Sequence, residues 1–187
     1  MPLSEVPIIM LSIDNYDRIE RMRDVLMKDP NAPLLLEGEK HEYSILWIDP
    51  ETGILSKAKI DQWSTHINSL VDIKTTTDAS RYGFARSVFK YGYYFQGAMY
   101  LRGLNALEID IQDFTIIAQE KEPPFAVGCY TLDDDAIELG YAQLDYLMER
   151  FERFETGELD SASYSNKVEI LSLPRWSVDV IHDLISR

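Results

Sequence analysis

The sequence predicts an α/β domain in which a mixed central β-sheet is flanked by helices. Runs with strand-like and helix-like spacing of apolar residues alternate along the chain, in the order α-β-β-β-α-β-β-α. Turn-forming Pro and Gly residues separate several of them. The chain has 187 residues, of which 45% are hydrophobic and 27% charged, enough for a packed core. We therefore expect a single domain over residues 1–187, with residues 1–10 as an arm and residues 156–187 as a C-terminal extension.

In the first half of the chain, one helix precedes three strands. Apolar residues at steps of three or four predict a helix over residues 12–28, and the Pro-containing segment 29–33 ends it. Strand-like runs follow at residues 42–48, 54–63 and 67–74. Short connections between these runs favour antiparallel hairpins.

In the second half, a helix precedes two strands and a final helix. Three consecutive aspartates at residues 133–135 mark the start of the last helix, because acidic side chains are favourable at a helix N-terminus. The expected elements are a helix at 79–101, in one piece or in two around Gly92, strands at 114–119 and 125–132, a helix from residue 133, and an extended segment at 168–174.

The charge of the chain is uneven. A net charge of −14 argues against nucleic acid as a partner, because a basic surface is its usual sign. Residues 57–102, however, carry seven basic and only three acidic side chains. This stretch is either a solvated helix face or a local track for phosphate groups on an otherwise acidic body. In the second case Lys57, Lys59, Arg81 and Arg86 are the candidate DNA-binding residues.

Two further features of the sequence limit the classes of protein to which the chain can belong. No apolar run approaches the roughly 20 residues that span a bilayer, so we expect no membrane segment. The single cysteine, Cys129, excludes an internal disulfide and fits a reducing compartment such as the cytoplasm. Because Cys129 lies in an apolar, strand-like run, we expect a buried and unreactive thiol.

Two aspartates and a lysine are the candidate catalytic residues. If the second and third strands form a hairpin, Asp61 lies opposite Asp72, and opposed residues are about 5 Å apart. Lys74 shares a strand face with Asp72, because the two are two residues apart. Carboxylates that hold Mg²⁺ beside a lysine are suited to phosphodiester hydrolysis. Glu42, at the start of the first strand, is either a third oxygen ligand or a solvated strand end.

The predicted helix at residues 79–101 carries a second candidate group. Gln96 and Tyr100 are four residues apart, so they share one helix face, from which their polar atoms can reach phosphates or the lysine. An ordinary helix with a half-buried tyrosine would give the same spacing. The aromatic run at residues 91–95 points to both sides of the helix, so part of it belongs to the core and the rest is free to contact DNA or a neighbouring subunit.

Taken together, these residues resemble the PDDEXK nuclease superfamily. Within it they resemble the RecB-like branch, and most of all the exodeoxyribonuclease VIII family of phages and prophages. The resemblance runs from about Glu42 to Pro174 and lies in the joint pattern of several segments rather than in any one of them. These segments are residues 47–53, 57–61, 71–76, 91–100, 120–127 and 171–176.

The resemblance implies a restriction-endonuclease-like fold and a role for each residue of the candidate site. Asp61, Asp72 and the backbone carbonyl of Ile73 would be ligands of Mg²⁺, with Mn²⁺ as a possible substitute. Lys74 would be the catalytic lysine. The pair Gln96 and Tyr100 would be the helix motif of the branch.

The activity that the resemblance implies is digestion of one strand of linear double-stranded DNA from 5′ to 3′. The remaining single strand would pass to a single-strand annealing protein in phage or prophage recombination. Family members form rings through which DNA threads, which implies a homo-oligomer. The implied location is the cytoplasm of a bacterium or of a phage-infected host.

The chain departs from the family pattern in two places. Family members take a histidine for the metal site from an upstream helical region, and none of His41, His66 and His182 stands at that position. The usual arginine before the first aspartate is also replaced, within residues 57–61. We therefore expect a shortened family member or a C-terminal nuclease fragment. Two alternatives stay open: a non-catalytic DNA-end-binding or assembly module of the same fold, and an endonuclease that cuts circular DNA.

Overall fold

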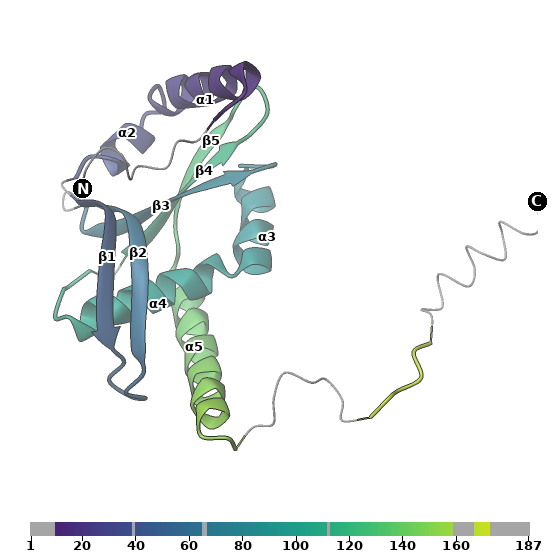
Figure 1. The fold of residues 1–187 in the computed structure, drawn as a ribbon. Helices are drawn as coiled ribbons and strands as arrows, with labels where there is room; N and C mark the ends of the chain where they lie inside the picture. Colours follow the sequence, from purple (N-terminus) through teal and green to yellow (C-terminus); the bar gives the residue numbers. More distant parts are fainter. Residues whose placement is uncertain (1–9, 39, 65–66, 112, 159–166, 173–187) are drawn as a thin grey trace, which may run out of the picture. The chain divides into compact units, whose positions relative to one another are not determined.

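The computed structural model describes residues 10–38, 40–64, 67–111, 113–158 and 167–172. The chain divides into two compact units, Met1–Glu152 and Arg153–Arg187. The first unit contains a five-stranded sheet with helices on both faces (Figure 1), so the predicted α/β class with a mixed sheet is confirmed. In the second unit, the described residues 167–172 form neither helix nor strand, and residues 173–174 of the predicted extended segment lie outside the described residues.

The sheet has the strand order β1-β2-β3-β4-β5. Only β3 and β4 pair in parallel, while the other neighbours are antiparallel. The two hairpins predicted in the first half of the chain are present, with strand ends within about two residues of the predicted ones. The strands are β1 (Lys40–Ile48), β2 (Leu55–Ser64), β3 (Ser69–Thr76), β4 (Asp113–Glu120) and β5 (Val127–Thr131).

The helices follow the prediction with two differences. Of the two forms expected for residues 79–101, the structure has two helices, separated by Gly92 in a left-handed conformation with φ 68°, and the second runs five residues further than predicted. A short helix after α1 was not predicted; the Asp29 carboxylate accepts hydrogen bonds from the first amides of this turn. The helices are α1 (Ile13–Leu26), α2 (Ala32–Leu35), α3 (Arg81–Tyr91), α4 (Tyr93–Ala106) and α5 (Asp134–Glu155). Among the described residues, no helix is long and apolar enough to cross a membrane.

The larger core lies between the sheet and helices α3, α4 and α5, and contains Phe84, Leu104 and Ile116. Helix α4 can lie close against the sheet because Gly103 has no side chain. A Cβ atom at this position would come within 2.9 Å of the Trp47 ring. A smaller core contains Val71 and packs on the opposite sheet face against residues of α1 and α2. Strand β3 is therefore covered on both faces.

Arg102 of α4 holds the β1–β2 turn and α5 in place. Its guanidinium, only 10% exposed, donates two hydrogen bonds to the carboxylate of Asp49, at 2.6 and 2.8 Å. It also forms ion pairs with Asp145 and with Glu51. Burial alone would raise the pKa of Asp49, but the bonds from Arg102 and Thr52 outweigh it, and the pKa lies below the usual range. This basic residue therefore serves the fold and is not available to DNA.

We expect Arg102→Leu to lower the free energy of unfolding by about 3 kcal/mol, because the buried carboxylate of Asp49 would lose its cation. Urea denaturation at neutral pH measures this change. The matched control is Arg150→Leu on exposed α5 surface, which should cost less than about 1 kcal/mol. Equal costs for both variants would contradict a structural role for the Arg102 ion pairs.

Candidate active site

Strands β2 and β3 pair at only three described positions before they separate. The pairs are Gln62 with Val71, Trp63 with Leu70, and Ser64 with Ser69. The next residues along the same register are Asp61 and Asp72, so the opposition predicted for these two aspartates agrees with the observed pairing. We call the place where the strands part, bordered by Asp61, Asp72 and Ile73, the β2–β3 fork.

At the fork, a hydrogen bond to a side chain takes the place of the backbone hydrogen bonds that would join β2 and β3. Asp61 Oδ2 accepts a hydrogen bond from the backbone N–H of Ile73, at 3.2 Å. In an extended strand the N–H and C=O of one residue point to the same side. The carbonyl of Ile73 therefore faces the same side as Asp61, and two carboxylates and one carbonyl border the fork.

Asp72 is buried and held from two directions. Its Oδ1 accepts a hydrogen bond from Gln96 Nε2 at 2.7 Å, and its Oδ2 lies 2.5 Å from Lys74 Nζ. Burial is the strongest influence on its pKa and raises it, Lys74 and Gln96 act in the opposite direction, and the charge of Asp61 raises it further. The net result is a pKa above the usual range for an aspartate.

Two tyrosines of α4 complete the surroundings of Lys74. The Lys74 ammonium lies 5.0 Å from the centre of the Tyr93 ring. Tyr100 packs edge-on against Phe114, and its pKa is raised by burial and, to a lesser extent, by the charges of Asp72 and Asp61. The structure therefore brings the predicted Gln96 and Tyr100 to the aspartates. Tyr93 was not predicted; its signal was its position three residues before Gln96, on the same helix face.

Glu42 does not join the two aspartates. Its side chain forms an ion pair with Lys59 at the exposed surface, and its backbone has a φ of 51°. In the described part of the chain, no three acidic, histidine or cysteine side chains gather closely enough to hold a metal ion. The structure therefore favours the solvated strand end over the third ligand, and His41 lies exposed next to it.

The donors at the fork nevertheless suit Mg²⁺. This ion prefers hard oxygen ligands and keeps several waters, so one or two carboxylates are sufficient. Asp61 and Asp72 supply two carboxylates, and the Ile73 carbonyl supplies a third oxygen of the same kind. His66 and His182 lie outside the described residues.

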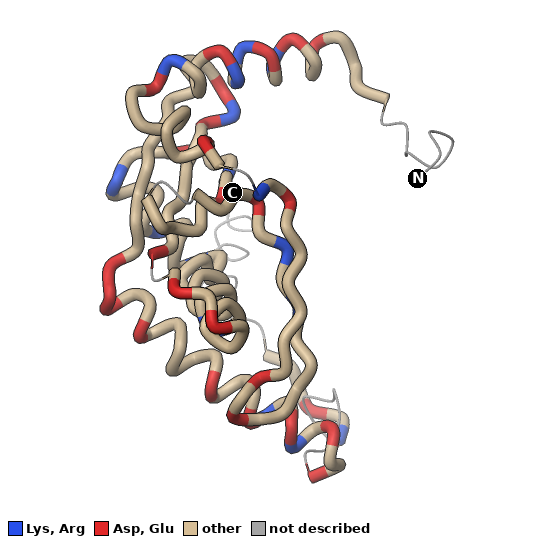
Figure 2. Tube along the Cα trace, turned by 90° about the vertical axis from the view of Figure 1, so that its left-hand side faces the viewer, with Lys and Arg blue, Asp and Glu red and all other residues tan. Residues whose placement is uncertain are grey.

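The four predicted DNA-binding residues lie on two elements. Lys57 and Lys59 are exposed on β2, and the second of these is paired with Glu42. Arg81 and Arg86 are exposed on α3. Elsewhere acidic residues outnumber basic ones along most of the trace (Figure 2). The basic stretch of the sequence thus forms the part of the fold that contains the β2–β3 fork and helix α3.

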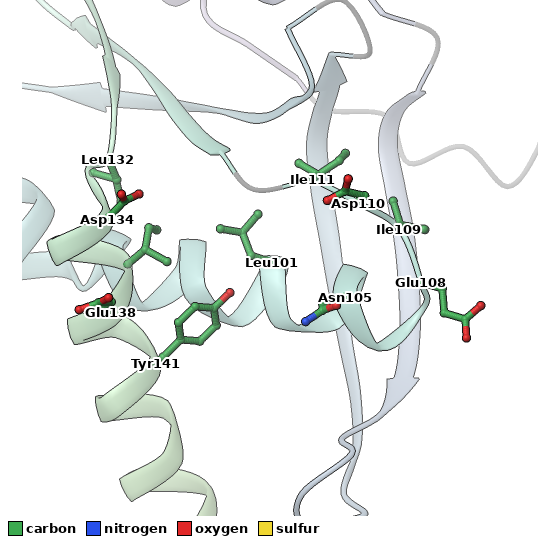
Figure 3. Close-up of a pocket in the computed structure, with 11 residues that line it drawn as sticks. Leu101, Asn105, Glu108, Ile109, Asp110, Ile111, Leu132, Asp134, Glu138 and Tyr141 are labelled. Carbon is green, nitrogen blue, oxygen red and sulfur yellow. The ribbon is translucent and has the colours of Figure 1, made fainter.

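A hollow of about 510 Å³ lies apart from the fork, beside the end of α4 and the start of α5 (Figure 3). Its rim includes Glu108, Asp134 and Glu138, and Leu101 and Ile137 line its apolar part. Phosphate groups are repelled by such a rim, so this hollow is a poor site for DNA.

Cys129 is half-buried, and burial, together with the nearby Asp29, raises the pKa of its thiol to about 11. A thiol with such a pKa stays protonated at neutral pH and is a weak nucleophile. The prediction of an unreactive cysteine agrees with this environment.

Comparison with known proteins places the chain in a family. Residues 4–174 match the family model described as a PDDEXK-like domain of unknown function (DUF3799). No curated protein matches the sequence. Among solved structures, one described as a putative exonuclease from Eubacterium rectale matches with a TM-score of 0.67 and 18% sequence identity. The match covers 88% of this chain and 65% of that protein, so this chain spans less than two thirds of its length.

The burial of Asp72 has a consequence for stability. Because its pKa is higher in the folded chain than in an unfolded one, the ionised carboxylate disfavours folding, and stability falls as the pH rises through that interval. We expect Asp72→Asn, whose amide oxygen still accepts from Gln96, to unfold at higher urea concentration than the wild type at pH 7 with EDTA. The advantage should shrink as the pH is lowered to about 4, the ordinary pKa of an aspartate.

The control for this prediction is Asp17→Asn, the same substitution at an exposed position of α1. It should leave the urea midpoint nearly unchanged at both pH values. A lower midpoint for Asp72→Asn than for the wild type at pH 7 would mean that the ion pair with Lys74 outweighs the cost of burial.

Proposed function

The chain belongs to the PDDEXK-like family, and on that premise we propose that it is a metal-dependent nuclease that hydrolyses phosphodiester bonds of DNA. The observation that carries the proposal is the β2–β3 fork. There Asp61, Asp72 and the Ile73 carbonyl present oxygens together, and Lys74 lies against Asp72. A buried acid with a raised pKa beside a lysine is costly for the fold, and such groups are concentrated at functional sites.

The residues of the fork would divide the chemistry among them. Asp61, Asp72 and the Ile73 carbonyl would hold Mg²⁺, or Mn²⁺ in its place, which lowers the pKa of a bound water and offsets phosphate charge. Lys74 can orient the attacking water by hydrogen bonding and add positive charge beside the phosphate.

Two side chains of α4 would keep this arrangement fixed. Gln96 holds one oxygen of Asp72, so the second oxygen keeps its direction towards Lys74. The Tyr93 ring covers the Lys74 ammonium and limits its motion. Preorganised groups of this kind lower the barrier because they need no rearrangement during the reaction.

The finer proposal comes from the resemblance to exodeoxyribonuclease VIII. On this view the substrate is linear double-stranded DNA, digested from 5′ to 3′, and the product strand goes to a single-strand annealing protein in phage or prophage recombination. The protein would act as a ring-shaped homo-oligomer in the cytoplasm. The match to one described exonuclease structure supports the fold that these steps require.

One observation favours a second candidate, a non-catalytic module that binds DNA ends. The fork offers two carboxylates, and Glu42 is paired with Lys59 instead of completing the set. A site with few ligands holds its metal weakly, so the same fold can bind DNA without turnover. Cleavage assays separate the two candidates.

We expect Asp72→Asn and Lys74→Met to reduce DNA cleavage by at least roughly a hundredfold. The first removes a carboxylate that would hold the metal, and the second removes the positive charge beside the phosphate. Cleavage of labelled double-stranded DNA in Mg²⁺ measures the effect, and urea denaturation verifies folding. Lys28→Met, at an exposed lysine far along the sequence from the fork, is the matched control and should cleave like the wild type. Full activity of a folded Lys74→Met variant would remove the lysine from the mechanism.

The polarity and the metal are tested with linear DNA labelled at the 5′ or the 3′ end, beside a closed circle. We expect loss of the linear substrate from the 5′ end in Mg²⁺ or Mn²⁺, an intact circle, and no reaction in EDTA. Cutting of the circle would instead establish an endonuclease. No cleavage in any divalent metal, with DNA binding retained, would establish the binding module.

A further inference from the structure

The solvent-facing side of α3 is unusually aromatic and carries only positive charge. Its exposed residues at 81, 82, 85, 86, 89 and 90 form one continuous stripe along the helix. Within this stripe Tyr82 is 76% exposed and Phe89 72% exposed. Phe89 stacks on the ring of Tyr94, with centres 6.3 Å apart, and still leaves most of its surface in solvent. Exposed rings that gather on one face of a helix are typical of a binding surface.

The charges on this face are all of one sign. The segment 81–91 contains three basic residues and no acidic residue, in a chain with a net charge of −14. The guanidinium of Arg86 lies 4.7 Å from the centre of the Tyr82 ring, and Lys90 Nζ lies 5.2 Å from that of Tyr91. Rings and cations therefore alternate along one surface. We call it the α3 face; it consists of Arg81, Tyr82, Arg86, Phe89, Lys90 and Tyr91.

The α3 face leads directly to the candidate active site. The ring of Tyr91 stacks on that of Tyr93, with centres 5.7 Å apart. Lys74 of the fork lies 5.0 Å from the centre of the same Tyr93 ring. A small hollow of about 130 Å³ lies along this path. Its lining includes three consecutive threonines, Ser87, both of these tyrosines and Lys121, which are groups that donate hydrogen bonds to phosphate or sugar oxygens.

We propose that the α3 face binds a single strand of DNA, with bases stacked on Tyr82 and Phe89 and phosphates close to Arg81, Arg86 and Lys90. This inference rests on the proposed nuclease function and identifies the form of the substrate strand beside the fork. Aromatic rings stack only on bases whose faces are free, which excludes the interior of a duplex. Basic side chains between the rings offset the charge of the backbone.

The other occupant to consider is a protein, either a second copy of this chain or another partner. An apolar helix face is also typical of protein interfaces. The alternation of rings with cations, and the continuity with Lys74, favour DNA over protein. The two occupants predict different results for the same variants.

The test measures binding without cleavage. Fluorescence anisotropy in EDTA would follow a labelled oligo(dT), an abasic strand of equal length and a duplex, each titrated with the wild type and with the double variant Tyr82→Ala, Phe89→Ala. Because a stacked base contributes roughly a tenfold or larger factor in affinity, the wild type should bind oligo(dT) at least about tenfold more tightly than the abasic strand. The double variant should lose this preference while its residual, salt-dependent binding persists.

The chain offers a closely matched control. On α5, Tyr146 and Arg150 repeat the spacing of Tyr82 and Arg86, with the ring 56% exposed and the guanidinium 5.6 Å from its centre. Tyr146→Ala should leave oligo(dT) affinity unchanged, because the surrounding α5 surface is acidic. An equal loss in this variant would overturn the assignment to α3.

Two further outcomes would overturn the proposal. The first is equal affinity of the wild type for oligo(dT) and the abasic strand. The second is a change in molar mass of the double variant by light scattering, with DNA binding intact, which would make the α3 face a protein interface. Because binding is measured in EDTA, a lack of cleavage in Mg²⁺ with this preference intact would contradict only the proposed nuclease activity.

Discussion

The parallel pairing of β3 with β4 determines where the parts of the candidate site lie. Parallel strands cannot be joined by a tight turn, so the chain must cross over one face of the sheet. Helices α3 and α4 make this crossover, and the left-handed residue Gly92 separates them. Because α4 covers the middle of β3, Gln96 meets Asp72 inside the fold. Helix α3 precedes α4 in this crossover, and the side of α3 that faces away from the core is exposed to solvent.

The electrostatics of the chain follow from the same arrangement. Burial under α4 raises the pKa of Asp72, and Lys74 and Gln96 partly offset that effect. Arg102, on the same helix, is instead held by Asp49 and neighbouring acids and stabilises the fold. Basic residues outnumber acidic ones in residues 57–102, the part of the chain that contains the fork and α3, while acidic residues dominate elsewhere. Such a distribution directs an anionic ligand to one part of the surface.

Local patterns in the sequence predicted most of the fold and the centre of the site. The opposition of Asp61 and Asp72 followed from strand spacing, and the proximity of Lys74 from alternation along β3. Features that depend on distant parts of the chain were left open or missed. The ion pair of Glu42 with Lys59, which leaves two carboxylates at the fork, depends on a distorted backbone. The burial of Arg102 depends on three acidic partners, two in the β1–β2 turn and one on α5. No spacing rule encodes such contacts.

Because the pairing between β2 and β3 is short, the sheet consists of two parts that few backbone hydrogen bonds join. The β1–β2 hairpin forms one part and β3, β4 and β5 form the other, and three described residue pairs join them. Asp61 belongs to the first part, and Asp72 and Lys74 to the second. Local opening of a fold begins where few backbone bonds must break. The amide proton of Ile73, bonded to a carboxylate instead of a strand, is therefore a natural reporter of this opening by hydrogen exchange, and the site exists only while the two parts stay joined.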